Sequence, residues 1–273
     1  MIPDPESTRA SLERIGKEGL AAEGLAEAAL LLASLDRPGV PLDRYREQLD
    51  SFSESARARG ESSPAAALAE TFAGEFGFAG DEKTYDDPQN ANLIRVIDRR
   101  KGLPVALGIL YIATARALGL DAGGLNFPNH FLIRVQDGGA RQIIDPFNGG
   151  AVLDARDLRR LLTSFQGEQA ELSQAHYRDV SDLDILLRLQ NNIKLRLLRN
   201  GKLEPALRVI RDMRLLAPGL PSLMREEGLL LARKGERRAA IGCLRDFLAT
   251  DNIPEPERLE VARMLQVLES QLN

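Results

Sequence analysis

The chain has 273 residues, of which 44% are hydrophobic and 28% are charged, with a net charge of −4 and an isoelectric point near 5.5. This size suits one large globular domain or two smaller ones, and the lack of a basic excess argues against direct nucleic-acid binding. One Cys and two His, far apart in the sequence, exclude an internal disulfide framework and a zinc site, so we expect no metal and no cofactor.

The first half of the chain is predominantly helical in its patterning. The opening residues are polar and contain no apolar signal segment, which predicts a soluble cytoplasmic protein without a membrane-bound part. Apolar residues then recur at helical spacing in several segments, one of which begins with Ser63 as a cap and Pro64 in its first turn. The predicted helices are Leu20–Leu35, Leu42–Ala58, a helix beginning at Ser63 and Pro64, and Asn92–Arg100.

The segment from Pro104 to Leu118 is apolar almost throughout. A helix that is apolar on nearly all sides is a buried one, and fifteen or so residues are too few for a membrane span. Proline at its first turn loses no hydrogen bond. We expect Gly119 and the pair Gly123–Gly124 to end this helix and to turn the chain.

Two β-rich runs follow, Phe131–Val135 and Gln142–Ile144, separated by Asp137-Gly138-Gly139. They predict a hairpin that carries His130 on one strand and Asp145 on the other. A loop of Asp137 and Gly138 places the two residues directly opposite each other. A loop of Gly138 and Gly139 places them diagonally on the same face.

In either register Asp145 can accept a hydrogen bond from one ring nitrogen of His130 and fix its tautomer. This is the orienting half of a catalytic triad. The other interpretation is that the two residues form a polar pair that only stabilises the sheet.

Ala151–Leu153 reads as a third short strand, and Asp154 caps a predicted helix that ends near Leu162. The polar stretch Gln166–Asp179 is the expected domain boundary, so we divide the chain into residues 1–178 and 179–273. His176 lies in this stretch, and we interpret it as a surface or packing residue.

The tail contains an internal repeat. A shift of 34 residues superimposes Leu195 on Leu229, Gly201 on Gly235 and Ala206 on Ala240, which is the tetratricopeptide period. Leu259–Leu272 then reads as a terminal helix. Cys243 occupies an apolar position of the second repeat, and we interpret it as a small buried hydrophobic residue. The fold class is therefore α+β: mostly helical, with a small antiparallel sheet and an all-helical tail.

Linked motifs in the core resemble a known family. Gly-Leu-Pro before the buried helix, Asn-Phe-Pro-Asn-His-Phe-Leu up to Leu132, and Ile-Asp-Pro-Phe-Asn-Gly-Gly from Ile144 look like the transglutaminase-like, papain-like core of the bacterial SirB family. Proteins of this family carry a tetratricopeptide-like tail. The resemblance covers most of the chain, from about Gly24 onward.

The wider superfamily uses a Cys at the start of the core helix, a His on the next strand and an Asp on the strand after it. The resemblance assigns the last two roles to His130 and Asp145, and the Cys position falls at or next to Pro104. Proline offers no nucleophile, and every side chain from Gly102 to Leu110 is apolar or absent.

The resemblance therefore implies a degenerate, non-catalytic triad remnant in a protein that binds a protein or peptide partner or acts in regulation. An enzyme without a thiol remains the alternative. In that hydrolase or amidase, His130 held by Asp145 would act as a general base.

Overall fold

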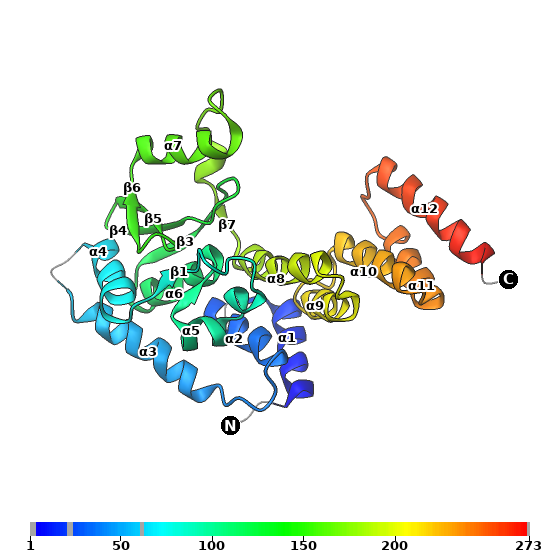
Figure 1. Cartoon of the computed structure of the whole chain (residues 1–273), viewed down its shortest axis with the longest axis horizontal. Coiled ribbons are helices and arrows are strands. Elements are labelled where there is room, and N and C mark those ends of the chain that lie inside the picture. Colours follow the sequence, from blue (N-terminus) through cyan, green and yellow to red (C-terminus); the bar gives the residue numbers. More distant parts are fainter. Residues whose placement is uncertain (1–3, 21–23, 61–62, 272–273) are drawn as a thin grey trace. The chain divides into compact units, whose positions relative to one another are not determined.

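The computed structural model describes residues 4–20, 24–60 and 63–271. The fold is α+β and mostly helical, with one antiparallel sheet and a helical tail, as predicted (Figure 1). The chain forms two compact units. The first comprises Met1–Ser11 and Gly19–Leu189, and the second comprises Leu12–Glu18 and Gln190–Asn273. The units divide within helix α8, whereas the sequence places the domain boundary before this helix, between residues 178 and 179.

Helices α2, α3, α4 and α5 pack around α6, which is buried on nearly all sides because its sequence is apolar all round. Ser63 caps α4 as expected, because its side chain accepts from the backbone of Ala66. Residues 21–23 of the predicted helix Leu20–Leu35 lie outside the described residues. The helices are α1 (Pro5–Glu18), α2 (Leu25–Leu35), α3 (Asp43–Arg57), α4 (Pro64–Ala69) with the π-helix η2 (Glu70–Glu75), η3 (Pro88–Ala91), α5 (Leu93–Arg99), α6 (Pro104–Ala117), α7 (Ala155–Gln166) and η4 (Gln174–Tyr177).

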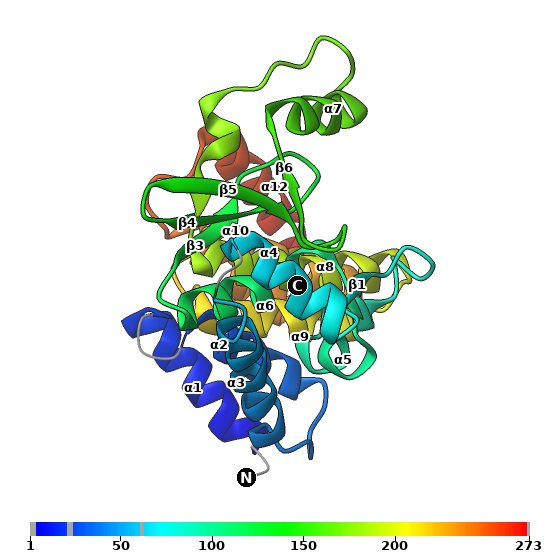
Figure 2. The ribbon, with the colours of Figure 1, turned by 90° about the vertical axis from the view of Figure 1, so that its left-hand side faces the viewer.

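Five antiparallel strands form the sheet in the order β6-β5-β4-β3-β7, and a parallel pair β1-β2 lies apart from it. The sheet lies between α6 and α7 (Figure 2). A small apolar cluster, including Leu132 of the sheet region and Leu158 of α7, fills the α7 side. The strands are β1 (Ala79–Gly80), β2 (Lys101–Gly102), β3 (Asp121–Leu125), β4 (Ile133–Asp137), β5 (Ala140–Asp145), β6 (Ala151–Leu153) and β7 (Asp179–Val180).

The register confirms one of the two predicted hairpins. Ile133 pairs with Ile144 and Asp137 with Ala140, so Gly138 and Gly139 form the loop, both with positive φ. The expected turn at Gly123–Gly124 is wrong, because both glycines lie inside β3. A Cβ at Gly124 would lie 2.7 Å from the ring of Phe131, so glycine is needed there for packing rather than for a turn.

The second unit has the predicted repeat of two helix pairs. The turns at Gly201 and Gly235 have positive φ, as their glycines suggest. The apolar core of this unit includes Ala206, Leu231 and Leu244. Its helices are the segment Leu12–Glu18 of α1, the C-terminal part of α8 (Asp182–Arg199), α9 (Leu203–Leu216), α10 (Pro221–Lys234), α11 (Arg237–Leu248) and α12 (Glu255–Ser270).

Candidate functional site

His130 does not lie in a strand, and in this detail the prediction from sequence is wrong. It follows a turn at Pro128 and Asn129, in which Asn129 has a φ of 54°, and β4 begins only at Ile133. Proline cannot donate to a strand ladder, and a left-handed residue ends an extended chain. The His130 side chain therefore reaches Asp145 from a turn rather than across a pair of strands.

Asp145 is the last residue of β5 and is 2% exposed. Its Oδ2 lies 2.9 Å from His130 Nε2 and accepts from Asn148 Nδ2 at 2.7 Å. Its Oδ1 accepts from the backbone N–H groups of Phe147 at 3.0 Å and Asn148 at 3.3 Å. The buried carboxyl group is thus fully hydrogen-bonded, which is what burial of a charge requires.

Burial by itself raises the pKa of Asp145. The hydrogen bond and charge of His130, together with the Asn148 donors, outweigh this effect, so the pKa of Asp145 lies below its ordinary value. The carboxyl group is therefore ionised near neutral pH and can only accept hydrogen bonds.

The Asp145 carboxylate fixes the tautomer of His130. An ionised carboxylate has no proton to donate, so His130 Nε2 must carry the hydrogen of the 2.9 Å contact. In neutral His130 the lone pair is then on Nδ1, for which the described residues provide no hydrogen-bond partner. The His130 side chain is 11% exposed. The pair can thus orient an imidazole whose free nitrogen is a hydrogen-bond acceptor or a base.

Several neighbours of His130 could not be identified from the sequence. Arg188, from α8, donates to the His130 backbone carbonyl at 2.9 Å and lies 5.3 Å from the ring centre of Phe131, and its burial lowers its pKa. The ring of Phe165, from α7, stacks on His130 at 6.4 Å. These residues are separated from His130 by more than thirty positions, and the sequence carries no signal for either contact.

Pro104 occupies the first turn of α6 and is buried. One turn later, Gly108 is close-packed against Phe131, the neighbour of His130, since a Cβ at Gly108 would lie 2.4 Å from that ring. Further along α6, burial and the Asp145 charge raise the pKa of Tyr111. Helix α6 therefore runs beside the His130–Asp145 pair with no thiol or hydroxyl nucleophile in its first turns.

His176 and Cys243, the other two residues considered from the sequence, do not contact the His130–Asp145 pair. His176 Nδ1 accepts from the backbone N–H of Ser173 at 3.2 Å, and its ring lies 5.9 Å from that of Phe127, so it caps η4 and packs on Phe127. Cys243 is partly buried in α11 of the second unit, and this burial raises its pKa. A raised thiol pKa disfavours the reactive thiolate.

The described residues contain neither a candidate metal site nor a membrane-spanning helix. In residues 4–20, 24–60 and 63–271, no three His, Cys, Asp or Glu side chains are grouped closely enough to hold a metal ion. Within the same ranges, every helix is too short or too polar to cross a membrane.

Comparison with known proteins identifies both parts of the chain. Residues 43–191 match the transglutaminase-like superfamily, and residues 193–266 match the tetratricopeptide repeat. The solved structure of menin aligns over 94% of this chain and 82% of its own at 11% identity, but a TM-score of 0.42 supports no conclusion.

Curated relatives extend over most of the chain. A UPF0162 protein of Xylella fastidiosa is 30% identical over 82% of this chain and 83% of its own length. A UPF0162 protein of Vibrio cholerae is 30% identical over 86% and 90%. Protein SirB1 of Salmonella typhimurium is 28% identical over 70% and 71%. The chain therefore belongs to the transglutaminase-like superfamily and, with these relatives, to the UPF0162/SirB1 family.

Proposed function

We propose that this protein is non-catalytic and acts as a protein-binding or regulatory module. The observation that supports this proposal is the buried Pro104 at the start of α6, where the superfamily resemblance calls for the nucleophile. The His130–Asp145 pair is the remainder of a triad that lacks its reacting atom. The single thiol of the chain, Cys243, belongs to another helix and has a raised pKa.

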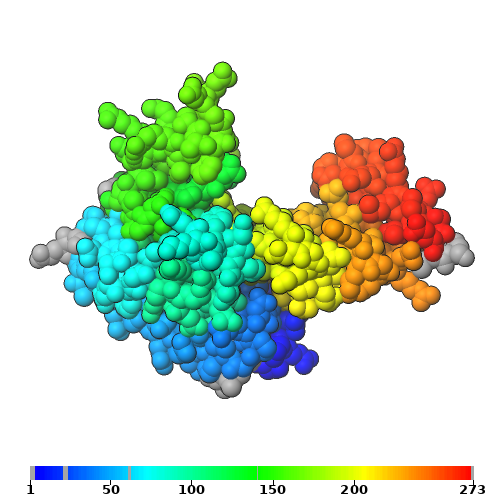
Figure 3. All heavy atoms as spheres, in the orientation of Figure 1, coloured from blue at the N-terminus to red at the C-terminus, as the bar shows by residue number. Residues whose placement is uncertain are grey.

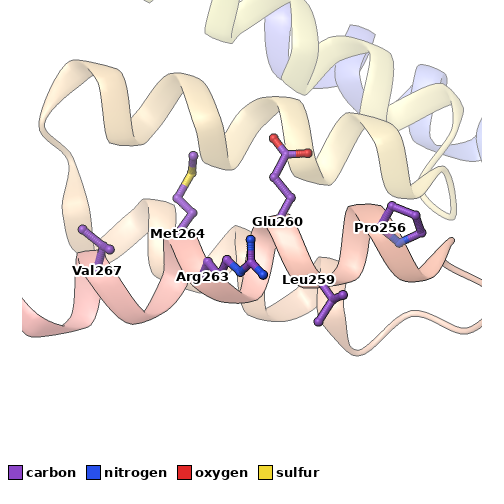
Figure 4. Close-up of a pocket in the computed structure, with 6 residues that line it drawn as sticks. All are labelled: Pro256, Leu259, Glu260, Arg263, Met264 and Val267. Carbon is purple, nitrogen blue, oxygen red and sulfur yellow. The ribbon is translucent and has the colours of Figure 1, made fainter.

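The tail supports the protein-binding part of the proposal. Tetratricopeptide repeats generally expose surfaces that bind proteins. Six residues of α12 line a hollow of about 600 Å³ whose lining is largely apolar (Figure 4). Leu259 and Val267, which line this hollow, are 49% and 54% exposed. Large apolar side chains that are exposed together are typical of interaction surfaces.

The alternative is a hydrolase or amidase that works without a thiol. It is favoured by the geometry of His130, whose Nε2 is held by Asp145 while Nδ1 has no hydrogen-bond partner among the described residues. Such an imidazole could remove a proton from water. The alternative still lacks a named donor for the developing oxyanion.

An activity assay separates the two functions. Purified wild type, His130→Ala and the matched control His176→Ala would be tested for ester hydrolysis, peptide-amide hydrolysis and amine transfer to glutamine side chains. We expect no turnover that depends on His130. Turnover in the wild type and the control, lost only in His130→Ala, would replace this proposal by the hydrolase alternative.

A capture experiment tests the binding role directly. Tagged wild type, His130→Ala and a Leu259→Gln/Val267→Gln double variant would be cross-linked in cells, and the captured proteins identified. A partner retained by His130→Ala but lost by the double variant places the function on α12. A partner lost only by His130→Ala places it at the degenerate site. Capture of no partner by the wild type contradicts a protein-binding role.

A further inference from the structure

The charge of the second unit is concentrated in two short segments. Residues 190–273 contain fifteen Lys and Arg and eleven Asp and Glu, a net charge of +4, although the whole chain has a net charge of −4. The segments 199–204 and 233–238 alone hold six of these bases and only two of the acids. The remaining nine bases and nine acids of the tail cancel. All of the excess positive charge therefore lies in two equivalent turns of the repeat.

The two turns lie at one edge of the unit. The 34-residue period aligns them, with Gly201 and Gly235 at the same repeat position. Lys234, at the end of α10, forms an ion pair with Glu204 at the start of α9 and a second one with Glu236. These contacts place the turns side by side, and the corresponding yellow and orange surfaces adjoin in Figure 3. We call the segments 199–204 and 233–238 together the basic edge.

Three cations of the basic edge are available to a partner. Lys202, Arg233 and Arg238 are exposed, and the described part of the chain offers none of them an ion pair. Arg237 donates only to the neutral amide of Gln271, at 3.2 Å. Both acids of the edge, Glu204 and Glu236, are already held by Lys234. The positive charge is therefore not neutralised within the unit.

We propose that the basic edge binds an acidic segment of a partner protein. The inference deepens the proposed protein-binding function and rests on it. A short run of carboxylates matches three free cations presented by two adjacent turns. A long polyanion fits less well, because the rest of residues 190–273 carries nine acids against nine bases and offers nucleic acid no further net positive charge.

The test compares two triple charge reversals in the full chain. The edge variant is Lys202→Glu, Arg233→Glu and Arg238→Glu. The matched control is Lys83→Glu, Arg156→Glu and Arg159→Glu, which reverses three exposed bases of the first unit and gives the same net charge. Each protein is titrated into a fluorescein-labelled oligoglutamate peptide and followed by fluorescence anisotropy at low and at physiological salt. Circular dichroism verifies that both variants fold.

We expect the edge variant to bind the peptide about tenfold more weakly or worse, with little change in the control, because several exposed ion pairs are lost together. Equal weakening in both variants would show a general charge effect and overturn the proposal. Stronger binding of single-stranded DNA or of anionic phospholipid vesicles than of the peptide would overturn it too.

The capture experiment separates this inference from the function on which it rests. If the edge variant still captures every partner of the wild type, the acidic-segment inference fails while the protein-binding role stands. If the wild type captures no partner, the protein-binding role itself fails. Loss of a partner in the edge variant alone, with an acidic stretch at the cross-linked position of that partner, supports both.

Discussion

His130 Nε2 lies 2.9 Å from Asp145 Oδ2, and Asp145 is almost fully buried. At this scale the pair matters to stability whether or not it matters to function. Removing one partner of a buried polar pair leaves the other without its hydrogen bond, which costs more than the bond contributes while it is intact.

We predict that Asp145→Ala destabilises the protein by about 1–3 kcal/mol, because it leaves His130 Nε2 and the donors of Asn148 unsatisfied. Urea unfolding of wild type and variant measures this difference. Asp145→Asn, which keeps an acceptor oxygen in place, serves as the control and should cost less. A midpoint of Asp145→Ala equal to that of the wild type would show that the pair does not stabilise the fold.

The lowered pKa of Asp145 predicts how acid acts on the protein. A carboxyl group with a lowered pKa in the folded state stabilises the protein fully above its ordinary pKa of about 4, and this contribution disappears as the pH falls through the folded-state value. The stability advantage of the wild type over Asp145→Asn should therefore shrink below about pH 4. Unfolding curves of both proteins from pH 6 downward measure it, and a constant difference would contradict the prediction.

The sequence predicts the meeting of His130 and Asp145 from residue parity in a hairpin, but His130 makes this contact from the turn before β4. It misplaces His130 in a strand, since the left-handed conformation of Asn129 has no signal beyond the preceding proline. It misses Arg188 and Phe165 entirely, because these contacts are formed by the packing of distant helices.

The sequence of helix α6 predicts its position and its burial, but tertiary packing explains the glycine in its interior. Its apolar sequence predicted its position and burial, and Pro104 marks its first residue as expected. Its interior glycine has a different origin: Gly108 leaves room for the ring of Phe131. A glycine inside a helix costs stability relative to alanine unless packing requires it.

Two glycine-to-alanine changes test this distinction. Gly108→Ala should destabilise the protein by about 1–3 kcal/mol, because its Cβ would lie 2.4 Å from Phe131 Cε1. Gly242→Ala, in α11 with open space around it, should stabilise by about 0.5–1 kcal/mol through helix propensity alone. Thermal unfolding measures both changes. A stabilising Gly108→Ala would show that the ring of Phe131 moves aside at no cost.

Elements with a strong local pattern were predicted correctly, among them α3, α6, the β4–β5 hairpin and the repeat helices. Of the short strands, β6 lies at Ala151–Leu153 as predicted, whereas β1, β2 and β7 have no sequence pattern that predicts them. The two-residue strand β7 pairs with β3, and the sequence predicts a turn at Gly123–Gly124, which lie inside β3. The π-helix η2 likewise continues α4 with no sequence signal for the change of helix type.

At the scale of the whole molecule, a catalytic site needs a shaped binding cleft as well as a nucleophilic atom. We predict that Pro104→Cys alone creates no protease or esterase, because the walls that would position a substrate and its oxyanion must also be present. Assays with activated esters and peptides test the variant, with Pro104→Ala as the control for local disturbance of the helix. Cleavage by Pro104→Cys alone would show a site that is complete except for its nucleophile.

The charge distribution belongs to this scale as well. The net charge and the 34-residue repeat can both be read from the sequence. That the two basic turns lie side by side is shown only by the ion pair between Lys234 and Glu204. A count of charges along a chain does not say which turns are neighbours, and that information comes from the fold.

The first helix, α1, is divided between the units, with Leu12–Glu18 belonging to the unit completed by the tail. Gly16 packs directly on the backbone of Leu215. A ribosome makes Gly16 about 200 residues before Leu215, a wait of roughly 10–40 s at ordinary elongation rates. Until then Gly16 has no α9 backbone to pack on, and Leu12 and Ile15, buried in the finished protein, belong to a unit that is not yet made. The nascent chain must therefore keep this segment from aggregating until α9 has emerged, which makes α1 a candidate for chaperone capture.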